Sequence, residues 1–255
     1  MGKRYLVTGG AGFIGSAMIN KLIKDPSNII ANVDKLTYAS NLDSLSSLKD
    51  NDSYSFFKCD ICDFNKLKEI IINFRPEIII NFAAESHVDR SIFASKEFIN
   101  SNIYGTYNLL EICRELCEKK EIIFHHISTD EVYGDIEGKP PSVETDSYKP
   151  SSPYSSSKAA SDHLVKAWHR TYKIPVFITN CSNNYGPYQH KEKLIPKVIT
   201  NVLNNKDIPV YGNGEQIRDW IFVEDHISGI LKVLESGEIG ETYNLGGNNE
   251  IRNID

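Results

Sequence analysis

Short apolar segments alternate with amphipathic segments along the first two thirds of the chain, and this alternation constrains the fold more than any other feature. The apolar segments are typical of strands and cover residues 5–7, 29–33, 54–57, 77–82, 122–128 and 176–178. The segments between them predict helices over residues 13–24, 64–74, 96–117 and 153–172. Strands that are apolar along their length and separated by helices indicate a parallel sheet buried on both faces. The sequence therefore predicts an α/β, doubly wound fold.

The regular alternation weakens after about residue 180. Proline and glycine interrupt shorter segments at Gly186-Pro187, Pro196, Pro209 and Gly212-Asn213-Gly214. Residues 242–245 again have the character of a strand. We therefore expect a nucleotide-binding domain over residues 1–180, with returning segments from about 215–245. Residues 181–255 are expected to form a smaller, interleaved and partial substrate-binding lobe.

Composition and charge exclude several classes of protein. Hydrophobic residues make up 40% and charged residues 24% of the 255 residues, which is ordinary globular usage. The net charge of −6 gives no electrostatic basis for binding nucleic acid or an anionic membrane. No apolar run approaches the roughly 18 residues of a membrane span. The N-terminus runs at once into a strand, so we expect no signal peptide and a cytoplasmic protein.

The five cysteines allow two interpretations. Cys59 and Cys62 have a C-x-x-C spacing, and Cys113 and Cys117 would complete four zinc ligands. Cys113 and Cys117 are also one helical turn apart, which fits a packed helix face. An odd number of cysteines with no secretion signal favours reduced thiols in a cytoplasm. We therefore expect no metal site.

A glycine-rich turn follows the first strand. Gly9, Gly12 and Gly15 form a G-x-x-G-x-x-G spacing at the start of the helix over residues 13–24. Turns of this kind let backbone N–H groups approach a pyrophosphate at the N-terminus of a helix. Asp34 closes the second strand, where a carboxylate accepts hydrogen bonds from a ribose and repels a 2′-phosphate. The pattern predicts a Rossmann-type site for NAD rather than NADP.

The next two strands end in residues suited to the same cofactor. Asp60 and Ile61 follow the third strand, where an adenine edge is expected. Phe82, Ala83 and Ala84 follow the fourth strand, and small residues there let a flat cofactor lie close to the backbone.

Tyr154 and Lys158 lie near the start of a predicted helix and share one face of it. A free tyrosine has a pKa near 10 and is a poor base at neutral pH. A lysine ammonium one turn away, together with a cationic nicotinamide ring, is expected to favour the phenolate. Tyr154 is therefore a candidate base for a hydroxyl proton.

These motifs together resemble a known family. The glycine turn with Tyr154-x-x-x-Lys158 is similar to the extended short-chain dehydrogenase/reductases that act on nucleotide sugars. Ser128-Thr129-Asp130-Glu131-Val132-Tyr133-Gly134 narrows the resemblance, because two carboxyl groups beside a threonine resemble the dTDP-glucose 4,6-dehydratases. Segments along nearly the whole chain carry the same similarity, including residues 83–91, 181–188, 192–196, 218–220 and 243–250.

The resemblance implies roles for five catalytic residues. Tyr154 and Lys158 would act in oxidation at C4 of a dTDP-glucose substrate, and Thr129 would hydrogen-bond the C4 oxygen. Glu131 would be the base at C5 and Asp130 the acid at the C6 hydroxyl. The pKa of Asp130 must then be raised by burial or by its neighbour. Hydride return to C6 closes the cycle, so NAD is not consumed.

The resemblance also implies two sets of binding residues. Those for NAD are Gly9, Gly12, Phe13, Ile14, Gly15, Asp34, Lys35, Leu36, Thr37, Asp60, Ile61, Phe82, Ala83, Ala84, Glu85, Ser86, Ser101, Tyr154, Lys158 and Asn184. Those for the substrate are Ser86, Thr129, Tyr154, Asn183, Lys193, Leu194, Pro209, Val210, Tyr211, Arg218 and Asn253. Lys193 and Arg218 are suited to the pyrophosphate of a nucleotide sugar, because a pyrophosphate needs cationic partners.

Two departures from the family pattern leave the nucleotide base open. His190-Lys191 replaces an aromatic residue and a proline, and Gly212-Asn213-Gly214 replaces a more usual Gly-Asp-Gly. The alternatives are a UDP-sugar 4,6-dehydratase or a 4-epimerase. A non-catalytic NAD-binding regulator is the alternative from another class, and the intact set of five catalytic residues argues against it.

The resemblance carries two further expectations. Helices near residues 96–117 and 153–172 resemble those that pair two subunits, which predicts a homodimer. The family continues beyond the position of Asp255, and Asn253 has the character of a helix N-cap. We therefore expect the substrate lobe to be cut short.

Overall fold

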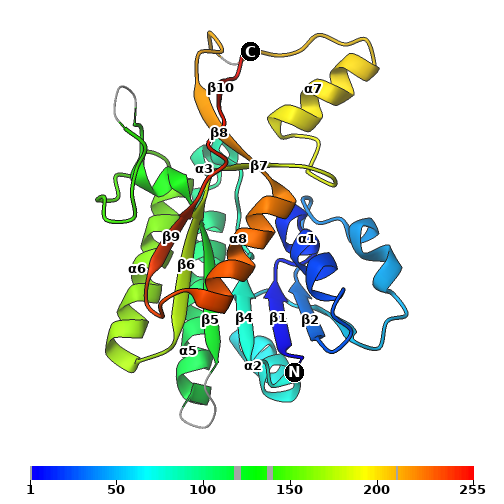
Figure 1. Cartoon of the computed structure of the whole chain (residues 1–255), viewed down its shortest axis with the longest axis vertical. Helices are drawn as coiled ribbons and strands as arrows, with labels where there is room; N and C mark the ends of the chain where they lie inside the picture. The colour runs from blue at the N-terminus through cyan, green and yellow to red at the C-terminus, as the bar shows by residue number, and fades with distance from the viewer. Residues whose placement is uncertain (1, 118–121, 137–139, 211) are drawn as a thin grey trace.

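A seven-stranded parallel sheet forms the centre of the protein (Figure 1), seen in a computed structural model that describes residues 2–117, 122–136, 140–210 and 212–255. Its strands, in spatial order, are β3 (Tyr54–Lys58), β2 (Ile29–Asp34), β1 (Arg4–Thr8), β4 (Ile78–Asn81), β5 (Ile123–Thr129), β6 (Val176–Cys181) and β9 (Thr242–Leu245). Each neighbouring pair is parallel. The strand order reverses between β1 and β4. This arrangement confirms the predicted α/β, Rossmann-type doubly wound fold.

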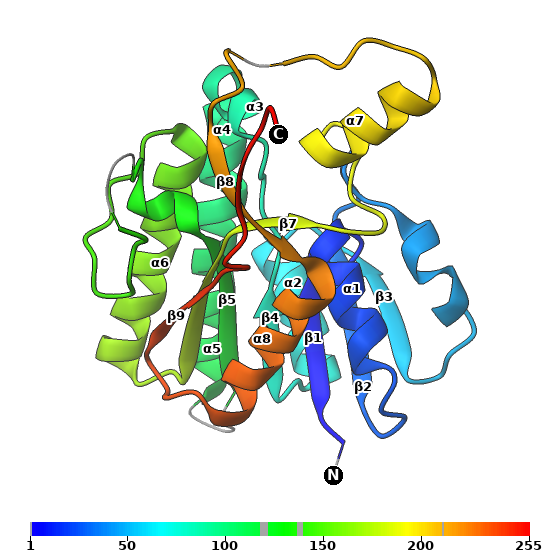
Figure 2. The ribbon, with the colours of Figure 1, turned by 45° about the horizontal axis from the view of Figure 1, so that its top comes forward.

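Two apolar clusters, one on each face of the sheet, explain why the strands are apolar throughout. On one face, side chains of β1, β4 and β5 pack against α2 (Phe64–Phe74), α5 (Gly105–Cys117) and α6 (Pro153–Tyr172). On the other face, the strands pack against α1 (Phe13–Leu22), η1 (Leu42–Leu48, a 3-10 helix) and α8 (Val223–Ser236). Figure 2 shows α1 and α8 side by side over the same face, as their contacts require. Leu6 and Val7 show the alternation, because neighbouring residues of β1 face opposite clusters.

The predicted helix over residues 96–117 is helical but not one α-helix. It comprises α4 (Ser95–Phe98), a π-helical segment η2 (Ile99–Tyr104) and α5, and it is preceded by a short helix, α3 (Val88–Phe93). The π-turn buries Asn102, whose amide donates to Glu85 O (3.0 Å) and Ser157 Oγ (2.8 Å). Asn102 lies within the π-helical segment, and the two bonds tie this segment to residues distant in the sequence.

The chain after β6 leaves the sheet and returns to it. It forms β7 (Asn183–Tyr185), α7 (Leu194–Leu203) and β8 (Ile217–Phe222) before α8 and β9, and it continues to β10 (Glu250–Arg252). A second sheet of three strands, in the order β10-β8-β7, forms above the carboxyl ends of the main strands. The returning strand at residues 242–245 is confirmed as β9, which pairs with β6.

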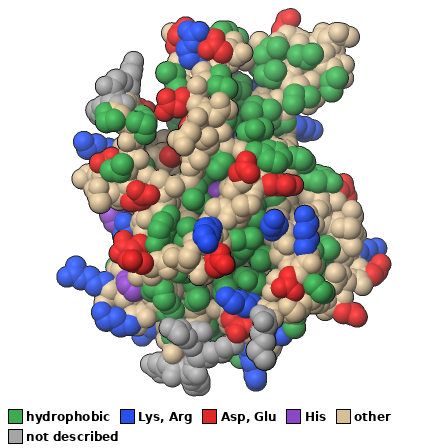
Figure 3. Space-filling view, in the orientation of Figure 1, with side chains coloured by type: hydrophobic (Ala, Val, Ile, Leu, Met, Phe, Trp, Pro, Cys, Tyr) green, Lys and Arg blue, Asp and Glu red, His purple; other side chains and the backbone are tan. Residues whose placement is uncertain are grey.

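Helix α7 stands apart from both sheets (Figure 1) and buries none of its residues. Its apolar side chains lie on the surface at the upper right of Figure 3, and Leu203 is 78% exposed. Asn253 and Ile254 form a turn after β10. Among the described residues, no helix is both long enough and apolar enough to span a bilayer.

Candidate active site

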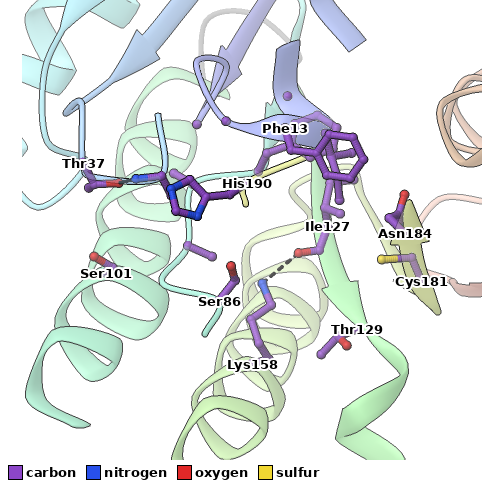
Figure 4. A pocket seen from close by; sticks show the side chains of 18 of the residues that line it. Phe13, Thr37, Ser86, Ser101, Ile127, Thr129, Lys158, Cys181, Asn184 and His190 are labelled. Carbon is purple, nitrogen blue, oxygen red and sulfur yellow. Dashed lines mark hydrogen bonds between the residues drawn. The ribbon is translucent and has the colours of Figure 1, made fainter. Parts of the chain in front are cut away.

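The carboxyl ends of β1, β2, β4, β5 and β6 open into one cavity of about 360 Å³ (Figure 4). Ligands of doubly wound sheets bind at this edge, beside the point where the strand order reverses. Most of the sequence-predicted residues line the cavity, namely Gly9, Gly12, Phe13, Ile14, Gly15, Asp34, Lys35, Thr37, Asp60, Ile61, Phe82, Ala83, Ala84, Ser86, Ser101, Thr129, Asp130, Glu131, Tyr154, Lys158, Asn183, Asn184, Lys193 and Leu194.

The glycine turn leaves no room for side chains. Gly9 has a φ of +67°, and a Cβ added there would lie 2.7 Å from the backbone nitrogen of Ala83. A Cβ at Gly15 would collide with the carbonyl oxygen of Gly9. Gly12 is the N-cap of α1 and supplies no side-chain cap. The first turn of α1 therefore presents backbone N–H groups to the cavity, which suits a pyrophosphate.

Asp34 holds the glycine turn and the following loop together. Its Oδ2 accepts a hydrogen bond from Ala11 N (3.0 Å), and its Oδ1 accepts from Leu36 N (2.7 Å) and Ser40 Oγ (3.0 Å). A carboxylate has about four lone-pair sites, so Asp34 keeps acceptor capacity for a ribose. Leu36 has a φ of +62° and does not line the cavity.

Lys35 contacts polar groups that follow β3 and β4 and one from the π-helical segment η2. Its Nζ donates to Ser101 Oγ (2.9 Å) and lies 3.4 Å from a Glu85 carboxylate oxygen and 3.8 Å from one of Asp60. Glu85 is fixed by Asn102, whose Oδ1 accepts from its backbone N–H (2.8 Å). Glu85 thus reaches the site through Lys35 without lining the cavity itself.

Thr129 ends β5 and caps η3 (Asp130–Tyr133), a single 3-10 turn that carries the two acidic residues. The Thr129 hydroxyl accepts from Glu131 N (3.3 Å) and donates to Asp130 Oδ1 (3.2 Å). Burial raises the pKa of Asp130 to about 6. Burial and the charge of Asp130 raise the pKa of Glu131 to about 7, and Arg218 opposes both shifts. The pair therefore holds a proton near neutral pH, as acid–base chemistry requires.

Tyr154 and Lys158 lie on α6, whose start is fixed by a capping box between Ser152 and Ser155. Lys158 Nζ donates to Ile127 O (2.7 Å), the dashed line in Figure 4, and lies 3.3 Å from His126 Nε2. Both catalytic candidates are buried, with 9% of Tyr154 and 3% of Lys158 exposed.

Burial is the largest cause of the pKa shifts of Tyr154 and Lys158. It lowers the pKa of Lys158 to about 8. Burial and then the Glu131 charge raise the pKa of Tyr154 well above 10, whereas a hydrogen bond with Thr129 lowers it. The protein's own groups therefore shift Tyr154 in the direction opposite to that expected from Lys158, because desolvation of the phenolate outweighs the lysine.

The open end of the cavity carries the predicted substrate residues from β7 and α7. Asn183 lies in β7, and Lys193 caps α7, with its Nζ donating to Ser86 O (3.2 Å). Burial lowers the pKa of Lys193, while Glu192 and Glu131 raise it. This end therefore places a cation near the acidic pair.

Several predicted residues do not line this cavity, and their contacts with a ligand stay predictions. Arg218 in β8 acts on Asp130 and Glu131 through its charge. Pro209 and Val210 are exposed in the loop after α7, and Asn253 donates its backbone N–H to Gln216 O (2.9 Å). Tyr211 lies outside the described residues.

The structure adds cavity residues that the motifs did not indicate, namely Val33, Ala39, Ser40, Cys59, Ile127, Ser128, Cys181, Ser182, Gln189, His190, Glu192 and Trp220. Five of them are direct neighbours of predicted residues in the sequence, which is the signal that would have found them, namely Val33, Cys59, Ser128, Ser182 and Glu192. Trp220 reaches the site through the pairing of β8 with β7, where it lies opposite Asn183.

The five cysteines form no disulfide, and the described residues contain no cluster of three or more His, Cys, Asp or Glu suited to a metal ion. Burial raises the pKa of Cys62 to about 12, and its Sγ donates to Asn100 O (3.3 Å). Cys113 is buried in the apolar cluster under α5.

Comparison with known proteins identifies a matching family model and closely similar relatives. A family model described as GDP-mannose 4,6 dehydratase matches residues 6–255. The dTDP-glucose 4,6-dehydratase of Neisseria meningitidis is 54% identical, over 99% of this chain and 73% of that protein. The dTDP-glucose 4,6-dehydratase 1 of Escherichia coli K12 is 52% identical, over 99% and 74%.

Solved structures agree with these relatives. The dTDP-glucose 4,6-dehydratase of Bacillus anthracis in complex with NAD superposes with a TM-score of 0.91 and 43% identity, covering 99% of this chain and 78% of that one. A UDP-glucuronic acid 4-epimerase of Bacillus cereus superposes with a TM-score of 0.90 but only 29% identity, covering 99% and 80%. The fold is thus shared with epimerases, while the sequence is closer to the dehydratases. The chain therefore belongs to the dTDP-glucose 4,6-dehydratase family.

Proposed function

We propose that this protein converts dTDP-glucose to dTDP-4-keto-6-deoxyglucose, with NAD as a cofactor that is regenerated in each cycle. One observation carries the proposal. The acidic pair Asp130-Glu131 and the Tyr154–Lys158 pair face the same cavity, and Thr129 hydrogen-bonds members of both pairs. An epimerase needs only the second pair, whereas elimination of water needs an added acid and base.

The residues present fit NAD. The crowded glycine turn leaves backbone N–H groups for the pyrophosphate, Asp34 offers acceptors to a ribose, and Ala83 and Ala84 leave space beside β4. When bound, NAD supplies the acceptor and later the donor of a hydride. The named relative from Bacillus anthracis carries NAD, which supports the same cofactor here.

Tyr154, Lys158 and Thr129 would act at C4. Tyr154, as its phenolate, would take the proton of the C4 hydroxyl as the carbon is oxidised to a ketone. The Lys158 ammonium one helical turn away would stabilise that phenolate, and the Thr129 hydroxyl would bond the C4 oxygen. Burial strengthens each interaction because the dielectric is low.

Glu131 and Asp130 would act at C5 and C6. The C4 ketone acidifies the C5 proton, which Glu131 removes. Asp130 gives a proton to the C6 hydroxyl, which leaves as water, and Glu131 returns its proton to C5 when C6 is reduced. The raised pKa values of both carboxyl groups support a pair that exchanges protons near neutral pH.

Residues 181–255 would bind the nucleotide end of the substrate, and residues 1–180 with the returning β9 would bind the cofactor. Lys193 and Arg218 are the cations suited to the pyrophosphate. Asn183, Leu194, Pro209, Val210, Tyr211 and Asn253 complete the proposed substrate set.

The decisive assay compares two substrates. We expect the purified protein to convert dTDP-glucose to a product that is lighter by one water, and to convert UDP-glucose more slowly. Mass spectrometry of both reactions measures this. A product of unchanged mass, epimerised at C4 with its C6 hydroxyl retained, would refute the dehydratase proposal and favour the 4-epimerase.

We also infer that two copies pair through the helical segments near residues 96–117 and 153–172. Their outer face carries exposed aromatic side chains, with Tyr104 49%, Tyr107 37% and Tyr172 46% exposed. Tyr104 and Tyr107 stack at 5.9 Å between ring centroids, and Trp168 meets Tyr107 edge-on. Aromatic groups of this kind are enriched in protein interfaces.

Light scattering after gel filtration tests the pairing. We expect the mass of a dimer at micromolar concentration, and a shift toward monomer in Tyr104→Glu/Tyr107→Glu. The matched control is Ile239→Glu, which lies outside both helical segments and is also 49% exposed. A monomer in the unsubstituted protein would contradict the inference. The five cysteines form no disulfide, which supports a reducing, cytoplasmic setting.

A further inference from the structure

A cluster of buried polar side chains lies beside Lys158, between the end of β5 and helix α6. It contains Ser128 and His126 from β5 and Ser161 and Asp162 from α6, each at most 4% exposed. None of these four side chains has a part in the proposed chemistry. Polar groups buried this completely are costly unless they are paired, so their arrangement calls for a physical reason.

Asp162 is the centre of this cluster. Its Oδ2 accepts a hydrogen bond from Ser128 Oγ (2.8 Å). Its Oδ1 lies 3.4 Å from His126 Nε2 and takes no hydrogen bond. Asp162 also follows Lys158 by four residues on α6, so the two side chains share one face of the helix.

The Nε2 atom of His126 lies close to both Lys158 and Asp162. His126 Nε2 is 3.3 Å from Lys158 Nζ and 3.4 Å from Asp162 Oδ1. Burial, Lys158 and His125 lower the pKa of His126 well below its usual value, so the ring is neutral and does not replace the ammonium. Burial likewise lowers the pKa of His125 to about 3.

Other titratable groups also face Lys158 and Asp162, but none of those that the structure describes supplies a negative charge beside Lys158. The Cys181 thiol beside Lys158 is neutral, because burial raises its pKa to about 12, and burial also raises the pKa of Tyr154 well above 10 in the protein alone. Tyr148 and Lys166 face Asp162 from its other side, and Lys166 favours its ionised form. Within the described part of the chain, Asp162 is the carboxylate that acts on Lys158.

We propose that Asp162 is a positioning residue, the buried counter-charge that holds the Lys158 ammonium behind Tyr154 and, through Ser128, fixes the end of β5. Ser128 directly precedes Thr129, so one carboxylate connects the lysine to the strand that carries the acidic pair. An ammonium this deeply buried loses its hydration, and an opposite charge beside the same histidine nitrogen offsets that loss. This inference rests on the proposed role of Lys158 in the reaction.

The test removes the charge and keeps the shape. In Asp162→Asn, the amide oxygen still accepts from Ser128, but Lys158 loses its counter-charge, so its pKa falls. The Lys158 ammonium acts in the oxidation at C4, so the rate of that step falls as pH rises through the pKa of Lys158, near 8 in the unsubstituted protein. A nearby opposite charge shifts a pKa by about 1 to 3 units. We expect the alkaline limb of the C4-oxidation profile, measured as reduced cofactor formed in a single turnover, to move down by about one pH unit or more.

Ser128→Ala is the matched control, because it removes the hydrogen bond and keeps the charge. Its alkaline limb should stay in place even where kcat falls. A readout without turnover separates this inference from the proposed function. In protein with isotope-labelled lysine, the Lys158 signal, assigned by its loss in Lys158→Met, should titrate at lower pH in Asp162→Asn than in Ser128→Ala.

Equal titration of Lys158 in Asp162→Asn and the unsubstituted protein would overturn the inference, whatever the activity. If Asp162→Asn does not fold, the inference is tested by two other measurements, one on Asp162→Glu and one on the unsubstituted protein. Asp162→Glu keeps the charge and should keep the alkaline limb. The Lys158 signal of the unsubstituted protein should show a second step near pH 6, where Asp162 takes up a proton. Absence of that step would also overturn it.

Discussion

Glu131→Gln should abolish formation of the 4-keto-6-deoxy product while the protein still binds NAD. A positioned general base contributes about 10²- to 10⁴-fold to a rate, and glutamine has no basic oxygen of comparable strength. Oxidation at C4 depends on Tyr154 and Lys158 instead, so we expect the reduced cofactor to accumulate in a single turnover. Rapid-mixing absorbance of the reduced nicotinamide, together with mass spectrometry of the sugar, measures both halves.

Asp130→Asn is the partner experiment, and deuterium exchange separates the two roles. In heavy water, Asp130→Asn should still exchange the C5 hydrogen but lose water slowly, whereas Glu131→Gln should show neither exchange nor elimination. The pKa order, about 6 for Asp130 and about 7 for Glu131, places a shared proton mainly on Glu131. The exchange experiment therefore decides which carboxyl is the base. Exchange retained in Glu131→Gln and lost in Asp130→Asn would reverse the assignment.

The raised pKa values of Asp130 and Glu131 also predict how the rate of elimination depends on pH. A base at Glu131 is ionised above its pKa of about 7, and an acid at Asp130 is protonated below its pKa of about 6. The productive form is therefore most abundant between these values, and elimination should slow on both sides.

Tyr154→Phe should also block formation of the product, but at the oxidation of C4, which precedes the elimination. Phenylalanine keeps the ring that meets Phe98 edge-on at 6.3 Å between centroids, so α6 should stay folded. It lacks the hydroxyl that takes the C4 proton, and we expect kcat to fall by about 10²- to 10⁴-fold with little change in NAD binding. Single-turnover measurement should show no reduced cofactor, in contrast to Glu131→Gln.

Phe98→Leu is a control for packing around Tyr154. It loosens the same contact but leaves the hydroxyl, so C4 oxidation should persist at a moderately reduced rate. Full C4 oxidation in Tyr154→Phe would show that another group takes the proton.

Local patterns were sufficient for the central sheet and most of its helices. The predicted helices over residues 64–74 and 153–172 have the observed bounds, because an apolar face and capping residues define them locally. The π-turn at Ile99–Tyr104 was not predictable in this way, because bonds from Asn102 to distant residues determine it. The second sheet was missed for the same reason, since β10 pairs with β8 across about thirty residues of sequence, Glu250 with Asp219.

The candidate site, like the fold, could be predicted from the sequence only in part. The strand ends and the glycine turn predict a shared cavity, because parallel strands bring their carboxyl ends to one edge of the sheet. The roles of Asp130 and Glu131 came from family resemblance, and spacing alone did not assign them. The raised pKa of Tyr154 was not foreseen, because burial of a side chain on the face of a helix is not visible in a Y-x-x-x-K spacing.

The return of the chain to the sheet has a consequence for how the protein acquires its structure. Strand β6 ends at Cys181, but its outer neighbour β9 begins at Thr242, so the hydrogen bonds along one edge of β6 wait for some sixty residues. During synthesis, that edge emerges unpaired, and unpaired edges are sites of wrong association. The sheet is therefore complete only after the lobe above it has been made, so the two are not independent modules. A break between them would harm the cofactor-binding half as much as the half it removes.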